Sequence, residues 1–368
     1  MSPPSASERV LDGAVWADFC AALKSAGEVV LREGSPRDPF DRAEGFRYLS
    51  RLTRAALEAF VEFADPRAPV LRRPAHETIK IGADNPDNHY QAAAISGEFE
   101  YRIRGQRGTI HYLGFGTYAG NYGSSKRSGQ TGYLEGSDLE LAPDGSFEIA
   151  LSCDERPGNW LRMEPDTASL IVRQTFLDRA HETLAELEIE RVDAAAAAAP
   201  LTPEALDQGL AAAGAYVAGC SRLFADWAEM FAKRPNQLPL FDPAVASAAH
   251  GDPHIRYYHG YWELEPDEAL VVEVTPPVCD YWNFQLNNHW MESLDYRYQR
   301  IALNKHEART RPDGSVRIVV AHRNPGTENW LETAGHRRGT MCLRWVRAES
   351  HPDPAARVVK LGDLASSS

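Results

Sequence analysis

Apolar and polar residues alternate along several stretches of the chain, as they do in the strands of half-buried sheets. In YWNFQLNNHW, residues 281–290, successive side chains of a strand point to opposite sides. The apolar face then consists of Trp282, Phe284, Leu286 and Trp290. The opposite face is an unbroken polar row of Tyr281, Asn283, Gln285, Asn287 and His289. Similar alternation in SLIVRQTF, EALVVEVTPP and SVRIVVAH predicts antiparallel sheets.

Two other segments have helical periodicity. Apolar residues recur at spacings of three and four along VWADFCAALKSAGEVVL, which begins at Val15, so this segment predicts an amphipathic helix. A second helix is expected to begin after Thr202, a candidate N-cap that is followed by Pro203 at the first helical position. The alanine run DAAAAAAP, residues 193–200, precedes this helix and is interpreted as a connector.

A long passage of the sequence occurs twice. PDGSFEIALSCDERPGNWLRMEPDTASLIVRQTF begins at Pro143, and PDGSVRIVVAHRNPGTENWLETAGHRRGTMCLRW begins at Pro312. Equivalent residues lie 169 to 171 positions apart, and the offset of 169 also pairs Tyr112 with Tyr281. Spacing shared over this much sequence predicts an internal duplication.

The predicted fold class is α+β and mainly β, with two duplicated antiparallel β-sandwich modules of jelly-roll type, each preceded by helices. The expected divisions are an N-terminal helical segment over residues 1–70, a first sandwich over 71–192, a helical connector over 193–250 and a second sandwich over 251–368. A doubly wound parallel sheet is disfavoured, because it would place a helix after nearly every strand.

The repeated passages also resemble a known family. GNWLRMEPDTASLIVRQTFLD in the first copy, and PPVCDYWNFQLNNHWMESLDY with the passage from Pro312 in the second, are similar to bacterial proteins that carry domain of unknown function 1214, often beside domain 1254. The resemblance is specific over residues 250–348 and looser over the first half. It implies a pair of β-sandwich domains with helical additions, and it implies no agreed reaction.

Composition and charge argue against several classes of binding partner. With 43% hydrophobic and 25% charged residues the chain is typical of globular proteins. A formal charge of -13 argues against nucleic-acid and acidic-membrane partners. We expect neither a secretory signal nor a membrane span. The five scattered cysteines include no C-x-x-C pair and favour a reducing cytoplasm. The sequence leaves a homo-oligomer open.

Familiar catalytic motifs are missing from the sequence. GFGTYAGNYGSSKRSGQTG, residues 114–132, is mis-spaced for a dinucleotide or P-loop motif and is interpreted as a loop between strands, although Lys126 and Arg127 could assist an anion there. Neither G-x-S-x-G nor H-E-x-x-H occurs. Several histidines gather in the second copy, but without i, i+2 or i, i+4 pairing we predict no metal and no cofactor.

The two copies can be compared with each other. Residues kept in both, such as Asn159 with Asn329 and Arg173 with Arg344, are interpreted as framework. The polar row is particular to the second copy. Its counterparts in the first copy are Gly114, Gly116, Tyr118 and Gly120. We therefore expect that the second copy gained polar side chains on an inward sheet face, at positions where the first copy has mostly glycine and so smaller side chains.

These differences give a set of candidate site residues. The proposed catalytic residues are His289 as the proton carrier, with Asp295, His322 and Tyr258 assisting it. The proposed substrate-binding residues are Asn283, Gln285, Asn287, Tyr296, Arg323 and Arg256. The alternative interpretation is that the row belongs to a sheet with one wet face, or that its amides bind loop backbones.

Three functional hypotheses remain from the sequence. The first is a cytoplasmic enzyme whose C-terminal module performs cofactor-independent acid–base chemistry, such as hydration, elimination, isomerisation or hydrolysis, on a small and partly apolar metabolite. The second is a non-catalytic carbohydrate- or lipid-binding or assembly module, since fold does not fix function. The third is a metal-dependent jelly-roll enzyme. An enclosed cavity with a titratable group would favour catalysis, and an open aromatic platform would favour binding.

Overall fold

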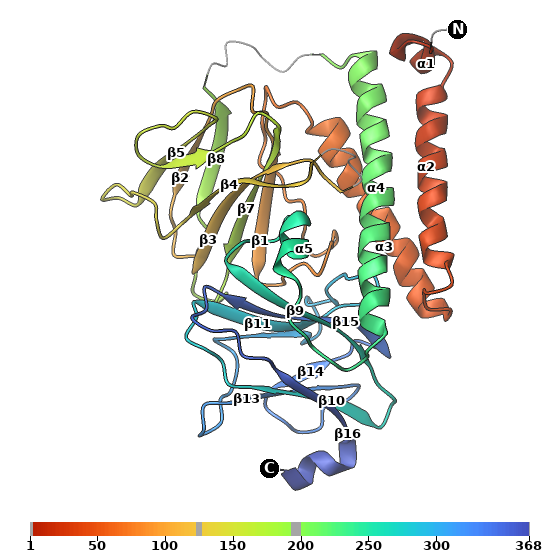
Figure 1. Cartoon of the computed structure of the whole chain (residues 1–368), viewed down its shortest axis with the longest axis vertical. Coiled ribbons are helices and arrows are strands. Elements are labelled where there is room, and N and C mark those ends of the chain that lie inside the picture. Colours follow the sequence, from red (N-terminus) through yellow and green to blue (C-terminus); the bar gives the residue numbers. More distant parts are fainter. Residues whose placement is uncertain (1–2, 123–126, 193–199, 368) are drawn as a thin grey trace.

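The computed structural model describes residues 3–122, 127–192 and 200–367. Most of the helical residues form one layer along the side of the molecule (Figure 1). The helices are α1 Ala6–Leu11, α2 Ala14–Leu31, α3 Pro39–Leu57 with a π-helical turn η1 Glu58–Glu62, α4 Pro203–Ala232, α5 Pro243–Ala248 and the 3-10 helix η2 Leu361–Ser367. Both predicted helices are confirmed, and the Thr202 side chain accepts a hydrogen bond from the Ala205 amide at 3.1 Å. The alanine run 193–200, interpreted as a connector, lies outside the described residues except for Pro200.

The first module is a pair of four-stranded sheets. One sheet has the order β1-β7-β3-β4, from Asn88–Ala94, Thr167–Thr175, Tyr112–Ala119 and Gly129–Glu135. The other has the order β6-β5-β2-β8, from Trp160–Arg162, Ser146–Ser152, Tyr101–Gln106 and Glu186–Arg191. A core that includes Ile103, Phe115 and Val172 joins them. The glycine-rich segment 114–132 is predicted from the sequence to be a loop, but residues 114–119 belong to β3 and residues 129–132 to β4. Only the part between these strands can connect them, and its residues 123–126 lie outside the described part.

The second module repeats this arrangement strand for strand. Its sheets have the orders β12-β11-β15-β9, from Ala302–Asn304, Tyr281–Leu286, Arg338–Val346 and Ile255–Glu263, and β14-β13-β10-β16, from Trp330–Glu332, Val316–Ala321, Glu268–Val274 and Ala355–Lys360. The duplication predicted from the sequence is confirmed. One detail differs from the expected antiparallel pairing, because β5 with β6 and β13 with β14 run parallel.

The repeated asparagines have the same structural task in both modules. The Asn159 amide donates to the carbonyls of Glu140 and Glu148, both at 3.0 Å. The Asn329 amide donates to the carbonyls of Arg309 and Arg317, at 2.8 and 3.1 Å. Each side chain therefore satisfies backbone groups of neighbouring segments, which is the framework role expected of a residue kept in both copies.

The helices share one core. α4 packs against α2 and α3, and Figure 1 shows these three helices running beside both modules. Their apolar faces meet in a cluster that includes Phe19, Leu52 and Phe224, and residues of the second module such as Tyr261 and Trp290 enter the same cluster. The helical layer thus holds the two modules together, where the sequence suggested only that helices precede each module.

Candidate functional site

A cavity of about 360 Å³ lies where the two modules meet the helical layer. β1 and β7 of the first module and β9 and β15 of the second contribute to its wall, and α4 closes another side with Tyr216, Phe224 and Trp227. Alanines 92–94 add a small apolar surface. A concave, mainly apolar space with a few polar groups is the usual form of a small-molecule site.

The loops that lead into β1 and β9 are related by the duplication. In the first, the backbone N–H of Asn85 donates to the hydroxyl oxygen of Tyr90 at 3.0 Å. In the second, the Asp252 amide donates to the hydroxyl oxygen of Tyr257 at 3.3 Å. Both tyrosines line the cavity. The wall therefore contains equivalent residues from both copies.

Two arginines connect each module to the loop of the other. Arg173 on β7 donates to the backbone carbonyl of His250 at 2.6 Å, and Arg344 on β15 donates to the carbonyl of Ala83. Both guanidinium groups are largely buried, with 8% and 4% of each residue exposed, and both residues line the cavity. These arginines do hold the framework, as the repeat suggested. The sequence did not show that they also face a shared space.

Two histidines line the same cavity. The ring of His259 on β9 lies nearly parallel to those of Phe231 and Tyr257, at interplanar angles of 8° and 6°. Its Nδ1 is buried without a hydrogen-bond partner among the described residues, and burial lowers its pKa to about 3. His250 receives a contact from the Ser128 hydroxyl at Nε2, 3.0 Å away, and burial followed by the charge of Arg173 lowers its pKa to about 4. Both imidazoles are neutral at pH 7, so both can accept a proton.

The chain was compared with known protein families and solved structures. Residues 265–350 match the family described as protein of unknown function DUF1214. The chain also matches the crystal structure of an uncharacterized protein from Burkholderia cenocepacia, at a TM-score of 0.95 and 56% sequence identity over 97% of this chain and 99% of that one. The chain belongs to the DUF1214 family. The companion domain 1254 suggested by the resemblance is not shown by these matches.

Other comparisons add little to the DUF1214 assignment. The VPA0106 protein from Vibrio parahaemolyticus is a more distant match, with 11% identity and a TM-score of 0.48 over 86% of this chain and 98% of that one. None of the curated proteins compared with the chain matches it. Among the helices that the structure describes, none has the length and apolar character needed to span a bilayer. The described residues also contain no group of three or more His, Cys, Asp or Glu side chains placed to hold a metal ion.

The polar row of the DUF1214 domain is buried and bonded to itself. Gln285 donates to the carbonyl of Asp84 at 2.9 Å and to Asn287 Oδ1 at 2.6 Å. Asn283 donates to Asn85 Oδ1 at 3.0 Å. Arg344 donates to Asn283 and Gln285 through Nη1, at 3.2 and 2.6 Å. The row faces inward, as predicted, but it holds Arg344 and the 83–85 loop and does not line the cavity.

The predicted proton carrier, His289, is not part of this row in the structure. β11 ends at Leu286, so the alternation that placed His289 beside Asn287 no longer applies three residues later. The ring is 1% exposed, its Nδ1 lies 2.9 Å from the Tyr261 hydroxyl, and its edge packs on Trp290. His289 does not line the cavity. The expected site on the sheet face is therefore replaced by a packed interior.

The other three proposed catalytic residues are not brought together. Asp295 is paired with Arg297 at 2.7 Å, and this partner lowers its pKa. His322 lies in the second sheet layer, with Nδ1 2.9 Å from Thr333 Oγ1. Tyr258 donates to the carbonyl of His351 at 2.8 Å. Each side chain has its own surroundings, because strand alternation and chain proximity do not fix which residues meet in space.

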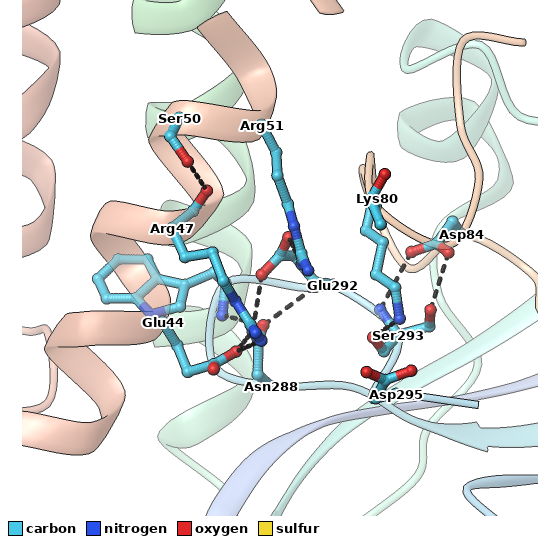
Figure 2. Close-up of polar contacts among 12 residues, drawn as sticks. Glu44, Arg47, Ser50, Arg51, Lys80, Asp84, Asn288, Glu292, Ser293 and Asp295 are labelled. Atoms are coloured by element: carbon cyan, nitrogen blue, oxygen red, sulfur yellow. Dashed lines mark hydrogen bonds and ion pairs between the residues drawn. The ribbon is translucent and has the colours of Figure 1, made fainter. Parts of the chain in front are cut away.

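Figure 2 shows how the segment around Asp295 is fixed. Arg51 on α3 forms an ion pair of 2.6 Å with Glu292, whose side chain is 1% exposed. Asn288 donates to Glu292 at 2.9 Å. Lys80 donates to the carbonyls of Ser293 and Leu294 at 2.6 and 2.7 Å. Buried charges that are paired and hydrogen bonded in this way order the 288–295 loop against α3, and this network accounts for its polar residues.

The remaining predicted binding residues also lie away from the cavity. Tyr296 is half-buried with the Lys80 ammonium 4.6 Å above its ring. Arg256 is half-buried and donates to the carbonyl of Pro253 at 3.1 Å. Arg323 is exposed. In the first module, the space expected beside Gly114 and Gly116 is filled: a Cβ at either residue would lie within 2.6 Å of the hydroxyl of Tyr133 or Tyr118.

The buried histidines make the stability depend on pH. An unfolded histidine titrates near 6.5, whereas burial holds the pKa of His259 and of His289 near 3 in the folded protein. Below pH 6.5 the unfolded chain binds more protons, so the folded state loses stability as pH falls. Each histidine should cost about 2 kcal/mol between pH 7 and pH 5.

Urea unfolding at the two pH values measures this loss. The His289→Phe variant lacks one titrating group and should lose about 2 kcal/mol less than the wild-type protein over the same interval. Equal losses in the two proteins would show that His289 is not held neutral in the folded state.

Proposed function

We propose that the protein is an enzyme that converts a small, partly apolar metabolite in the cavity between the modules by acid–base chemistry that needs no cofactor. The observation that carries the proposal is His259, a buried histidine in the cavity wall whose Nδ1 has no hydrogen-bond partner among the described residues. A neutral imidazole can take a proton from a bound molecule. The proposed reaction classes stay those expected from the sequence: hydration, elimination, isomerisation or hydrolysis.

The surroundings of His259 support this role. The rings of Phe231 and Tyr257 lie nearly parallel to the imidazole, and Phe241 packs on it edge-on. Cys342 Sγ lies 3.9 Å from Nε2. Aromatic packing of this kind restricts the ring and keeps its nitrogens in place, as proton transfer requires. An anionic group bound nearby would raise the pKa of His259 from about 3 toward the range in which general bases work.

A non-catalytic binding module is the second candidate. The aromatic wall formed by Tyr216, Phe224 and Trp227 would suit an apolar ligand with or without a reaction. The histidine in the cavity wall favours catalysis over this alternative. Cytoplasmic localisation belongs to the same proposal, and the five free cysteines are consistent with a reducing compartment.

A metabolite screen tests the proposal. Purified wild-type protein and the His259→Gln variant are incubated with a bacterial small-molecule extract, and mass spectrometry follows every compound. We expect at least one compound to be consumed, and to be consumed roughly 100-fold more slowly by the variant, the usual contribution of a general base. His322→Gln, outside the cavity, is the matched control and should behave as wild type.

The screen separates the two candidates. Consumption at the same rate by both proteins would remove His259 from the mechanism. A compound that co-purifies with the protein but is never converted would instead support the binding module.

A further inference from the structure

The charges in the cavity wall are opposite in sign to those of the whole chain. The protein carries a formal charge of -13. Among the described residues that line the cavity, three are arginines, Arg72, Arg173 and Arg344, and Asp84 is the one carboxylate. The Asp84 oxygens already accept from the Ser293 amide and hydroxyl at 3.0 and 2.8 Å. A concave, positively charged site in an acidic protein attracts negatively charged ligands.

The arginines have no carboxylate partner. Arg173 donates to the Tyr118 hydroxyl at 2.9 Å and to a backbone carbonyl. The acceptors of Arg344 are two side-chain amides and another backbone carbonyl. All of these acceptors are neutral. Because an arginine stays protonated in a protein, both buried guanidinium groups keep their positive charge. The charge of Asp252 acts on Arg173, and those of Asp84 and Asp87 interact with Arg344, without a direct ion pair among the described residues. An anion in the cavity would therefore lie near guanidinium groups that form no salt bridge with any described residue.

Arg72 is the arginine with donors to offer. It is half-buried, and its guanidinium makes no hydrogen bond or ion pair with the described residues. Its backbone pairs with Ala92 at the edge of β1, and Ala92, Ile171 and Arg173 continue along the same cavity-lining face of the sheet. Arg72 therefore lies on the same wall as the buried arginines but is not needed to connect the modules.

We infer that the substrate is an organic carboxylate, held by Arg72 in the field of Arg173 and Arg344, with its hydrocarbon part against the apolar wall. This inference rests on the proposed function and names its substrate class. A guanidinium matches a planar carboxylate with two parallel hydrogen bonds. Phe60, Tyr216 and Phe224 supply the apolar side of the site.

Isothermal titration calorimetry with three related probes tests the inference. The probes are 3-phenylpropionate, its neutral amide 3-phenylpropanamide, and phenyl phosphate, all at low ionic strength. Wild-type protein should bind the carboxylate about tenfold more tightly than the amide. Arg72→Met should remove this preference by weakening the carboxylate about tenfold while leaving the amide unchanged. Arg323→Met, an exposed arginine outside the cavity, is the matched control and should keep the preference.

Each other outcome has a defined meaning. Equal binding of carboxylate and amide by the wild type, no effect of Arg72→Met, or no binding of either probe would overturn the carboxylate assignment. Tighter binding of phenyl phosphate would overturn it in favour of a phosphate ester. The enzyme and the carboxylate site can fail separately. If the wild-type protein and His259→Gln bind the carboxylate equally well, and the wild-type protein converts no compound in the metabolite screen, the enzyme proposal is refuted and the carboxylate site stands.

Discussion

Trp290→Ala should lower the free energy of unfolding by about 4 kcal/mol, the typical cost of removing a buried tryptophan. Trp290 is 1% exposed and belongs to the core formed by the helical layer. Its indole nitrogen donates to the carbonyl of Asp41 at 2.8 Å. The ring also lies so close to α3 that a Cβ at Gly45 would be 2.7 Å from it. Removing the indole leaves a cavity where the second module meets α3 and removes the hydrogen bond to the Asp41 carbonyl.

Urea unfolding of Trp290→Ala, followed by far-UV circular dichroism, measures this loss. Trp16→Ala is the matched control, because Trp16 on α2 is 60% exposed and its truncation should change the free energy of unfolding by less than about 0.5 kcal/mol. Similar losses in both variants would mean that Trp290 does not join the module to the helices.

His289→Ala should lower the free energy of unfolding by about 3 kcal/mol, through the cavity left by the ring and the hydrogen bond lost by the Tyr261 hydroxyl. A proton carrier in an open site, the role that the sequence suggested for His289, would give the opposite result, lost turnover with an unchanged melting temperature. The structure reverses this expectation, because the ring is enclosed by Tyr261 and Trp290 and lies outside the cavity.

The same urea titration distinguishes the two roles of His289. His351→Ala is the control, since His351 is exposed and its loss should cost less than about 0.5 kcal/mol. A His289→Ala protein that is as stable as wild type, yet inactive in the metabolite screen, would restore His289 to the mechanism and contradict the structural assignment.

Several features of the fold could be predicted from the sequence because they depend on local spacing. The alternation in residues 281–286 gave the strand β11, and the repeat from Pro143 and Pro312 gave two modules that share strand order. The inward direction of Asn283 and Gln285 also followed from alternation, since a strand side chain has only two faces to choose from.

Side chains beyond the end of a strand do not follow the alternation of the strand. Trp282, Phe284 and Leu286 pack in the core of the second module, whereas Trp290, assigned to the same face, packs in the helical core. His289 departs from the polar row for the same reason. β11 ends at Leu286, and the residues beyond it follow a turn in which a period of two has no meaning.

The candidate site residues particular to one copy are not the ones that build the cavity. The repeat predicts that Arg173 and Arg344, kept in both copies, belong to the framework. In the structure the cavity lies where the copies meet, so equivalent residues from each copy, Tyr90 with Tyr257 and Arg173 with Arg344, line it together. A site to which both copies contribute equivalent residues is built from what the copies share.

The sequence by itself therefore determined the modules, their strands and the framework asparagines, because period and repetition are properties of neighbouring residues. Only the tertiary structure decided the candidate site. Arg72, His259 and Arg344 are far apart in the chain and carry no shared motif, and they line one cavity because two modules and a helical layer dock in one particular way. That docking depends on the shapes of whole surfaces, which no local pattern of residues records.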